Sequence, residues 1–334
     1  MQTMKERLLQ AIPRLAGQRI LVIGDLILDE YLTGAAARLS REAPIPVLEF
    51  EHRRTIPGGA ANPAMNIAAL GSQAIQVGLV GSDRAGEELI QCLRESNIET
   101  QGIVVDSNRC TTQKTRILAQ GSLRFPQQLV RLDRIDRHPP DAGIQTALVA
   151  QIRAAISRCL AILVSDYRNG LLTASLVQAI REEAANHARL LLVDSQGHLD
   201  KYQGYGVIRA NRPDTEAFLG RSLGTENTFE AAMAGLLKAL NAEGLVIGRG
   251  AQGVSVLGRD SAYYHFLPAN VTEVFDVTGA GDTSIAVLAL ALGAGLTLAE
   301  AAQLANYAAG LVVQKLGNAT PTAEALTAAI ERWG

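Results

Sequence analysis

Short apolar runs alternate with longer segments of helical periodicity along most of the chain. Apolar runs of this kind are typical of strands buried in a parallel sheet. The predicted strands cover residues 19–25, 74–81, 161–165, 189–194, 207–210, 244–248, 254–257 and 262–266. The predicted helices cover residues 5–15, 64–70, 83–96, 145–159, 172–187, 213–219, 227–240, 280–292 and 298–316. This alternation predicts a doubly wound, mostly parallel α/β sheet with helices on both faces.

Two stretches depart from the alternation. Residues 31–43 are polar and predicted to be irregular, and residues 44–51 combine prolines with strand-like alternation, which is typical of an exposed edge strand. Residues 103–105, 112–119 and 129–133 are predicted short strands of mixed polarity. Together these strands could form a small β-sheet that acts as a lid over the ligand-binding edge. We therefore expect one domain, residues 1–334, with lid strands inserted at about 31–57 and 103–135.

The composition is that of a globular protein without a charge bias. Of 334 residues, 48% are hydrophobic and 19% are charged, and the net charge of -2 gives no reason to expect a nucleic-acid partner. The three cysteines are widely spaced and the five histidines are scattered, so no CxxC or HExxH motif occurs. The N-terminus lacks the apolar stretch of a signal peptide, and the longest apolar run is too short to span a bilayer. We expect a soluble, cytoplasmic protein with no membrane partner.

The strongest chemical signal is the stretch DVTGAGDT at residues 276–283, just before a predicted helix. Gly279, Ala280 and Gly281 let backbone N–H groups approach a ligand closely, and the start of a helix favours an anion such as phosphate. The carboxylate of Asp282 would repel that anion unless it accepts a proton from a hydroxyl that attacks a phosphoryl group. The alternative is an ordinary helix start, with Thr278 or Asp282 as the N-cap.

Further candidates follow the first predicted strand and precede the second predicted helix. Asp25 and Asp29 lie at the carboxyl end of that strand, where open α/β sheets bind ligands. One of them could accept hydrogen bonds from sugar hydroxyls, or both could be turn or cap residues. Gly58 and Gly59 permit close approach of a ligand to the backbone, and Asn62 offers both a donor and an acceptor.

Four stretches together resemble the ribokinase-like (pfkB) family of carbohydrate kinases. They are GGAAN at 58–62 with Asn66 and Gly71, DVTGAGD at 276–282, NRPD at 211–214 with Glu216, and GD at 24–25 followed by Asp29. The resemblance runs from about residue 19 to residue 320 and implies an α/β fold with a β-sheet lid. It also implies transfer of a phosphoryl group from ATP to a sugar hydroxyl, with Mg²⁺ bridging the ATP phosphates.

The resemblance assigns roles to individual residues. Asp282 would be the base, and the N–H groups of Gly279, Ala280 and Gly281 would hold the developing negative charge. The residues expected to bind the sugar are Asp29, Gly58, Gly59, Asn62, Arg131 and Asp166, with Lys114 and Arg116 as further candidates for a substrate phosphate. The residues expected to bind the nucleotide are Asn211, Asp214, Arg249, Gly250, Gly253 and Asn306. Asn211 and Asp214, helped by Glu216, would orient the waters of Mg²⁺, and the family analogy allows a monovalent cation such as K⁺ near Asp276.

One branch of the family suggests the substrate. Residues 38–47, 127–133, 165–167 and 315–317 are similar to segments of D-glycero-β-D-manno-heptose 7-phosphate kinases, which implies conversion of that sugar phosphate to the 1,7-bisphosphate. Those kinases have Gly-Lys-Gly where this chain has Arg168, Asn169 and Gly170, a change that concerns the sugar phosphate. The family also has Glu at the position of Asp214, which has a shorter reach toward water bound to Mg²⁺. Ribose, fructose, fructose 6-phosphate and nucleosides are the alternative substrates.

Two other classes of protein were weighed against a kinase. A Rossmann dehydrogenase would require GxGxxG after the first strand, and residues 24–29 read GDLILD instead. A non-catalytic sugar or nucleotide sensor would most readily show a lost base or a broken anion hole, and the sequence retains both. The lid strands, with an apolar segment at 44–50, also lead us to expect a homodimer formed through the lid.

Overall fold

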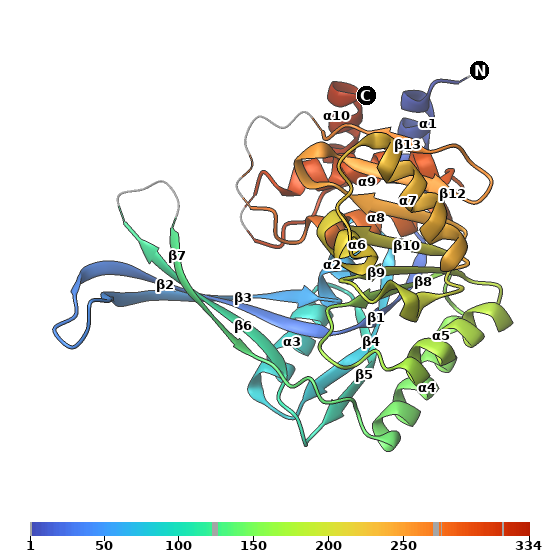
Figure 1. Cartoon of the computed structure of the whole chain (residues 1–334). Coiled ribbons are helices and arrows are strands. Elements are labelled where there is room, and N and C mark those ends of the chain that lie inside the picture. Colours follow the sequence, from blue (N-terminus) through green and yellow to red (C-terminus); the bar gives the residue numbers. More distant parts are fainter. Residues whose placement is uncertain (1, 122–125, 270–273, 275, 316) are drawn as a thin grey trace.

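A nine-stranded sheet forms the centre of the molecule (Figure 1). The computed structural model describes residues 2–121, 126–269, 274, 276–315 and 317–334. The strands are β1 (Arg19–Gly24), β4 (Gln73–Gly81), β5 (Glu99–Asp106), β8 (Ala161–Asp166), β9 (Leu190–Ser195), β10 (Val207–Asn211), β11 (Gly244–Gly248), β12 (Val254–Gly258) and β13 (Tyr264–Phe266). Their order is β13-β12-β11-β10-β9-β8-β1-β4-β5, and only the pairs that involve β12 are antiparallel. The predicted mostly parallel sheet is confirmed.

Helices cover both faces of this sheet. In β1, Ile20 and Val22 pack into one apolar core while Leu21 and Ile23 pack into the other, because successive side chains of a strand point to opposite faces. The helices that contribute to the first core are α1 (Met4–Ala11), α2 (Ala61–Ala69), α3 (Arg84–Glu95), α8 (Ala280–Gly293), α9 (Leu298–Val312) and α10 (Ala323–Trp333). Those that contribute to the second core are α4 (Ala142–Ile156), α5 (Ala174–Asn186) and α7 (Glu226–Ala239). The short helix α6 (Arg212–Leu219) directly follows β10.

Helix α8 is buried along most of its length. Every residue from Asp282 to Ala291 is buried, and the helix packs on α2, α9 and the strands β8 and β9. An apolar helix without a polar face is expected only where it is surrounded by protein. The burial of α8 therefore keeps the carboxylate of Asp282 largely away from bulk water.

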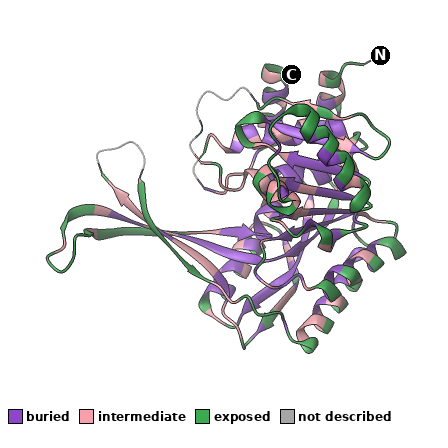
Figure 2. Ribbon diagram, viewed as in Figure 1, coloured by how far each residue is buried: buried purple, intermediate pink, exposed green. Residues whose placement is uncertain are grey.

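A separate four-stranded sheet forms the lid. Its strands are β2 (Leu26–Leu39), β3 (Pro46–Gly59), β6 (Thr112–Gln120) and β7 (Gln127–Arg134), in the order β3-β2-β6-β7. The lid extends away from the main body, and β2 and β3 change from buried near the body to exposed at the far end (Figures 1 and 2). The prediction that residues 31–43 are irregular was wrong, because most of them belong to β2. A strand that leaves the core loses the apolar alternation by which strands are recognised.

Two further predictions need correction. Residues 103–105 were expected in the lid, but they belong to β5, which pairs with β4 at the edge of the main sheet. Its polar positions are those of an edge strand rather than of a lid hairpin. Helix α10, which was not predicted, packs against α1 and α9, and the Nζ of Lys5 donates to the carbonyl of Glu331 at 2.8 Å. In the described part of the chain, no helix has the length and apolar character needed to cross a membrane.

Candidate active site

A tight turn leads into α8 and brings distant parts of the chain together. Gly279 has φ of 79°, in the left-handed region, and a Cβ there would lie 2.7 Å from Nδ2 of Asn62 and 2.9 Å from Oδ1 of Asn318. Glycine is therefore required both by the backbone and by the packing. Helix α8 begins at Ala280, whose N–H donates to the carbonyl of Val277 at 3.3 Å. The turn is thus held against two amide side chains at the start of the helix.

The carboxylate of Asp282 is buried and held by two side-chain donors. Its side chain is only 4% exposed. The hydroxyl of Tyr167 lies 2.8 Å from each carboxylate oxygen, and Nδ2 of Asn62 donates to Oδ2 at 2.8 Å. Burial, with a contribution from Asp194, raises the pKa of Asp282 to about 7, although both hydrogen bonds oppose the shift. A base with a pKa near neutrality is suited to proton abstraction.

A relay of hydrogen bonds fixes the orientation of Asn62. The Nδ2 of Asn66 donates to Oδ1 of Asn62 at 3.1 Å, and the hydroxyl of Thr283 donates to Oδ1 of Asn66 at 2.8 Å. Because the amide oxygen of Asn62 already accepts a hydrogen bond, its amide nitrogen is the group turned toward Asp282. The structure therefore ties the GGAAN segment to the GAGD segment at the level of individual atoms.

Arg209 and Asp194, which sequence analysis did not single out, lie beside Asp282. The Nη1 of Arg209 is 2.7 Å from Oδ1 of Asp194, and a Cβ at Gly281 would lie 2.7 Å from the same Nη1. Together with Tyr167, they line a cavity of about 220 Å³ that reaches Asp282. A signal for Arg209 was present, because an arginine interrupts the otherwise apolar run at 207–210. Asp194 had only its place at the carboxyl end of a strand.

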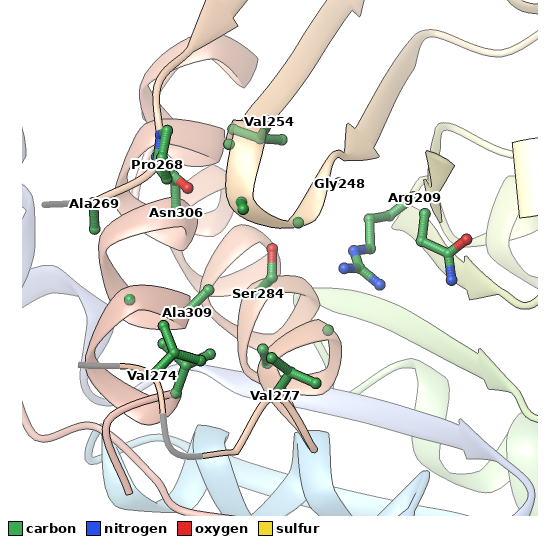
Figure 3. Close-up of a pocket in the computed structure, with 18 residues that line it drawn as sticks. Arg209, Gly248, Val254, Pro268, Ala269, Val274, Val277, Ser284, Asn306 and Ala309 are labelled. Carbon is green, nitrogen blue, oxygen red and sulfur yellow. The ribbon is translucent and has the colours of Figure 1, made fainter. Parts of the chain in front are cut away.

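A larger cavity of about 590 Å³ adjoins the smaller one (Figure 3). One side is apolar and includes Val254, Ala269 and Ala309, and Arg209 lies across the cavity from Pro268 and Ala269 (Figure 3). The residues that line both cavities are Arg209, Asn211 and Gly281. A ligand with an apolar ring and an anionic tail could therefore extend from the apolar side to Asp282.

Four of the predicted nucleotide residues line the larger cavity, and Arg249 does not. Those that line the larger cavity are Asn211, Gly250, Gly253 and Asn306. The side chain of Arg249 instead lies 4.3 Å from the centre of the Phe229 ring and forms an ion pair with Glu226 at 2.7 Å. The structure therefore does not bring Arg249 into the cavity, although its neighbours Gly250 and Ala251 line it.

The residues expected near Mg²⁺ surround the start of α6. Asn211 caps this helix, because its Oδ1 accepts the N–H of Asp214 at 2.7 Å. Glu216 is occupied elsewhere, since it pairs with Arg212 at 2.9 Å and accepts the N–H of Leu223 at 2.7 Å. Within the described residues, no three His, Cys, Asp or Glu side chains form a group able to hold a metal.

Three of the predicted sugar residues, Asp29, Gly58 and Gly59, lie where the lid joins the body. Asp29 is buried, its Oδ1 lies 2.6 Å from Nη1 of Arg116, and its Oδ2 accepts a hydrogen bond from Nδ2 of Asn318 at 3.0 Å. A Cβ at Gly58 would lie 2.1 Å from Oδ2 of Asp29, so only glycine fits beside the carboxylate. Gly59 has φ of 57°. Asn318 connects Asp29 to the turn at Gly279, a role that the sequence did not reveal.

The carboxylates of Asp25 and Asp166 interact with other residues of the chain. The N–H groups that donate to the carboxylate of Asp25 are those of Tyr167, Asn169 and Leu171. Asp166 forms an ion pair with Lys201 at 3.0 Å and accepts a hydrogen bond from the hydroxyl of Tyr202. Asp166 lines neither of the cavities beside Asp282, so the structure does not bring this predicted sugar residue into the site.

The basic residues predicted for a substrate phosphate lie on the lid. Arg131 is exposed and paired with Asp133 at 2.8 Å. The ammonium of Lys114 lies 5.3 Å from the centre of the Tyr167 ring, so it faces the residue that holds Asp282. Arg116 is the partner of Asp29. Lys114 and Arg116 thus lie on the side of the lid that faces the body.

The sequence profile described as "pfkB family carbohydrate kinase" matches residues 18–325. The chain belongs to this family. Among curated relatives of this pfkB kinase, the bifunctional protein HldE of Geobacter metallireducens is 40% identical over 90% of this chain and 60% of its own length. The HldE protein of Caulobacter vibrioides is 40% identical over 95% of this chain and 64% of its own length. The chain thus spans a little under two thirds of these relatives.

Solved structures confirm the fold of this pfkB kinase. Ribokinase of Arabidopsis thaliana, complexed with ribose and ATP, superposes with a TM-score of 0.73 at 17% identity, covering 95% of this chain and 99% of the other. Phosphofructokinase-2 of Escherichia coli, in complex with substrates and products, superposes with a TM-score of 0.77 at 18% identity and the same coverage. The predicted ribokinase-like fold is confirmed.

Proposed function

We propose that this pfkB kinase transfers the γ-phosphoryl group of ATP to D-glycero-β-D-manno-heptose 7-phosphate and forms the 1,7-bisphosphate. The observation that carries the proposal is the buried carboxylate of Asp282, which has a pKa of about 7 and lies where the smaller cavity joins the nucleotide-sized one. The relatedness to HldE proteins and the four segments that resemble heptose 7-phosphate kinases support the choice of sugar.

The residues of the site have complementary tasks in this reaction. Asp282 would accept the proton of the attacking hydroxyl, while Tyr167 and Asn62 keep its carboxylate in position. Arg209 lies beside the same cavity, where its guanidinium would stabilise negative charge that develops during transfer. The backbone groups proposed to help it are the N–H groups of Gly279, Ala280 and Gly281. Asp29, with Gly58 and Gly59, would bind sugar hydroxyls.

The larger cavity suits ATP because it is apolar at one side and carries Arg209 and Asn211 where it meets the smaller cavity. Mg²⁺ on the phosphates would neutralise charge there, with Asn211 and Asp214 orienting its waters. A monovalent cation near Asp276 is a further proposal. The oxygens of Asp276 accept hydrogen bonds from the N–H groups of Thr278 at 2.9 Å and Gly317 at 3.0 Å. This carboxylate thus joins two segments near the turn that leads into α8.

We also propose that two copies pair through their lids in the cytoplasm. Apolar side chains that a single copy leaves exposed on the lid are Leu39, Ile45, Phe50 and Leu132. Burying them against a second lid would remove this apolar surface from water. Gel filtration with light scattering tests the pairing, and a monomer at micromolar concentration would refute it.

A different sugar is the second candidate. Asn169 is buried and its N–H donates to Asp25, while Nη2 of Arg168 lies 3.0 Å from Nε2 of His198. The loop after β8 thus has these contacts where the heptose kinases that the chain resembles have the sequence Gly-Lys-Gly, and this favours testing fructose 6-phosphate, fructose, ribose and adenosine as well.

The decisive experiment is ADP release from ATP and Mg²⁺ with each of these sugars in turn. We expect rapid turnover only with heptose 7-phosphate. Turnover with an unphosphorylated sugar instead would reject the proposed substrate but keep the kinase. If no sugar supports ADP release while ATP still binds, the phosphotransferase proposal fails and a sensor becomes the better description.

A further inference from the structure

One row across the lid places three arginines around a tyrosine. Tyr31 of β2 pairs with Arg54 of β3 on one side and with Arg116 of β6 on the other, and Arg116 pairs with Arg131 of β7. Residues that pair across neighbouring strands project from the same face of a sheet. All four side chains therefore lie on one face of the lid, within a single row.

This row forms the lid side of a cavity of about 360 Å³. Among its lining residues, Tyr31, Arg54 and Arg116 come from the lid, and Asp276, Thr278 and Gly317 come from the body. The cavity thus lies between the arginine row and the loops near the turn at Gly279 that leads into α8. Arg131 is not among the residues that line it, since its guanidinium is held by Asp133.

The cavity contains hydrogen-bond donors without acceptors. The hydroxyl of Tyr31 is buried and has no hydrogen-bond partner among the described residues. The side chain of Arg54 is exposed and makes neither a hydrogen bond nor an ion pair with any residue that the structure describes. Arg116 uses Nη1 for Asp29, and its guanidinium carbon lies 5.2 Å from the centre of the Tyr31 ring. A buried hydroxyl without a partner is unfavourable, so the site is suited to a ligand that supplies acceptors.

The opposite face of the same strands shows that unpaired arginines are not a general property of the lid. Arg53, the neighbour of Arg54, pairs with Glu30 at 2.5 Å and with Glu88 of α3 at 2.9 Å. The hydroxyls of Thr55 and Thr115 donate to Glu88 and Glu30, respectively. That face is closed by ion pairs that fasten the lid to the body, whereas the row around Tyr31 retains unused donors.

The row lies at a defined distance from the sugar site. Asp29 and Tyr31 are two residues apart on β2, which places the row about 7 Å farther along the lid from the proposed sugar carboxylate. Resting on the kinase function proposed above, we infer that Arg54, Tyr31 and Arg116 form a subsite for a phosphate group that the sugar already carries. Guanidinium and phenol groups are suitable donors to phosphate oxygens. The carboxylate of Asp276 lies on the body side of the cavity and would keep the phosphate toward the lid.

The test compares one sugar with and without its phosphate. Binding of heptose 7-phosphate and of unphosphorylated heptose is measured by calorimetry in the absence of nucleotide. Hydrogen bonds to charged groups are worth about 1.5–3 kcal/mol, so Arg54→Gln should weaken heptose 7-phosphate roughly 10- to 100-fold. It should leave binding of unphosphorylated heptose unchanged. Tyr31→Phe, which removes one hydroxyl, should weaken only the phosphorylated sugar, by a smaller factor.

Arg38→Gln is the matched control, because it removes an arginine that is exposed on β2 and lies outside the row. It should change neither affinity. Three results would overturn the subsite. Arg54→Gln could lose the same affinity for both sugars, it could leave both affinities unaltered, or the wild-type protein could bind both sugars equally. ADP release separates this inference from the kinase proposal. If wild-type protein binds heptose 7-phosphate but does not phosphorylate it, the proposed reaction is refuted and the subsite is retained. If Arg54→Gln phosphorylates heptose 7-phosphate with an unchanged KM, the reaction is retained and the subsite is refuted.

Discussion

Asp25 and Asp282 are two carboxylates that are equally buried but accept hydrogen bonds from different kinds of donor. Each is 4% exposed, and burial raises the pKa of Asp25 to about 6 and that of Asp282 to about 7. Asp25 accepts hydrogen bonds from three backbone N–H groups of the loop after β8. Asp282 accepts hydrogen bonds from the side chains of Tyr167 and Asn62.

The difference shows what makes a buried carboxylate structural or reactive. Backbone donors cannot leave Asp25 unless the loop itself opens, so this carboxylate holds the loop in place. A side-chain donor that lines a cavity, as Tyr167 does, can instead turn and make room for a ligand hydroxyl. Tyr167 takes part in both arrangements, because its N–H donates to Asp25 and its hydroxyl donates to Asp282. The structural carboxylate thus positions the residue that orients the proposed base.

The strongest test of this comparison is Asp282→Asn. The amide retains the shape of the carboxylate and an acceptor for Tyr167, but it cannot take up the proton of a hydroxyl. We expect kcat to fall roughly 10²- to 10⁴-fold, which is the usual contribution of a positioned base. Steady-state ADP release measures this change, and near-normal turnover would remove Asp282 from the proposed role.

The same variant has a predicted effect on stability that depends on pH. The folded-state pKa of Asp282 is raised to about 7, so between about pH 4 and pH 7 the folded protein binds more protons than the unfolded chain. Its ionisation therefore destabilises the fold as the pH rises through this window. Asp282→Asn should be more stable than wild type at pH 8 and differ less at pH 5. Urea unfolding at the two pH values measures the difference, and equal effects would contradict the assigned pKa.

The next largest effect is expected from Asp25→Ala, and it should appear mainly in stability. Removing this carboxylate leaves three buried N–H groups without an acceptor, and each such group costs about 1–3 kcal/mol. We expect a loss of roughly 3 kcal/mol or more in the free energy of unfolding, measured in urea. Asp282→Ala is the matched comparison, because Tyr167, one of its two side-chain donors, lines a cavity where its hydroxyl can reorient. A smaller loss for Asp25→Ala than for Asp282→Ala would reverse the comparison.

Much of the fold follows from the sequence because the body has strong periodicity. The buried strands at 19–25 and 161–165 and the helix at 280–292 are long, apolar and bounded by glycine or polar residues, and the structure places them within a few residues of the prediction. The lid was less predictable. Residues 31–39 belong to β2, yet the strand leaves the core and is exposed from residue 36 to residue 39, so it lacks the alternation that a core imposes.

The sequence predicted those parts of the candidate site in which a glycine is required by close contacts. Gly58 and Gly279 are required by contacts with Asp29, Asn62 and Asn318, so the sequence marked these positions. The partners that give Asp282 its properties carried no such mark. Tyr167 directly follows β8 and Asp194 belongs to β9, and only the parallel order β10-β9-β8-β1 brings them to one edge. Their roles depend on packing between segments more than 80 residues apart in the chain, as with the 115 residues that separate Tyr167 from Asp282.

The smallest predicted effect concerns Tyr167→Phe and refines the distinction between the two carboxylates. Since only ionised Asp282 can accept a proton, kcat/KM should rise with pH through about 7 and level off above it. The Tyr167 hydroxyl lowers this pKa, so its removal should move the acidic limb to higher pH. Tyr205→Phe is the control, because it removes a buried hydroxyl bonded to the carbonyl of Val177, outside the site. It should leave the pH profile unchanged, and an unshifted limb in Tyr167→Phe would mean that the hydroxyl does not tune the base.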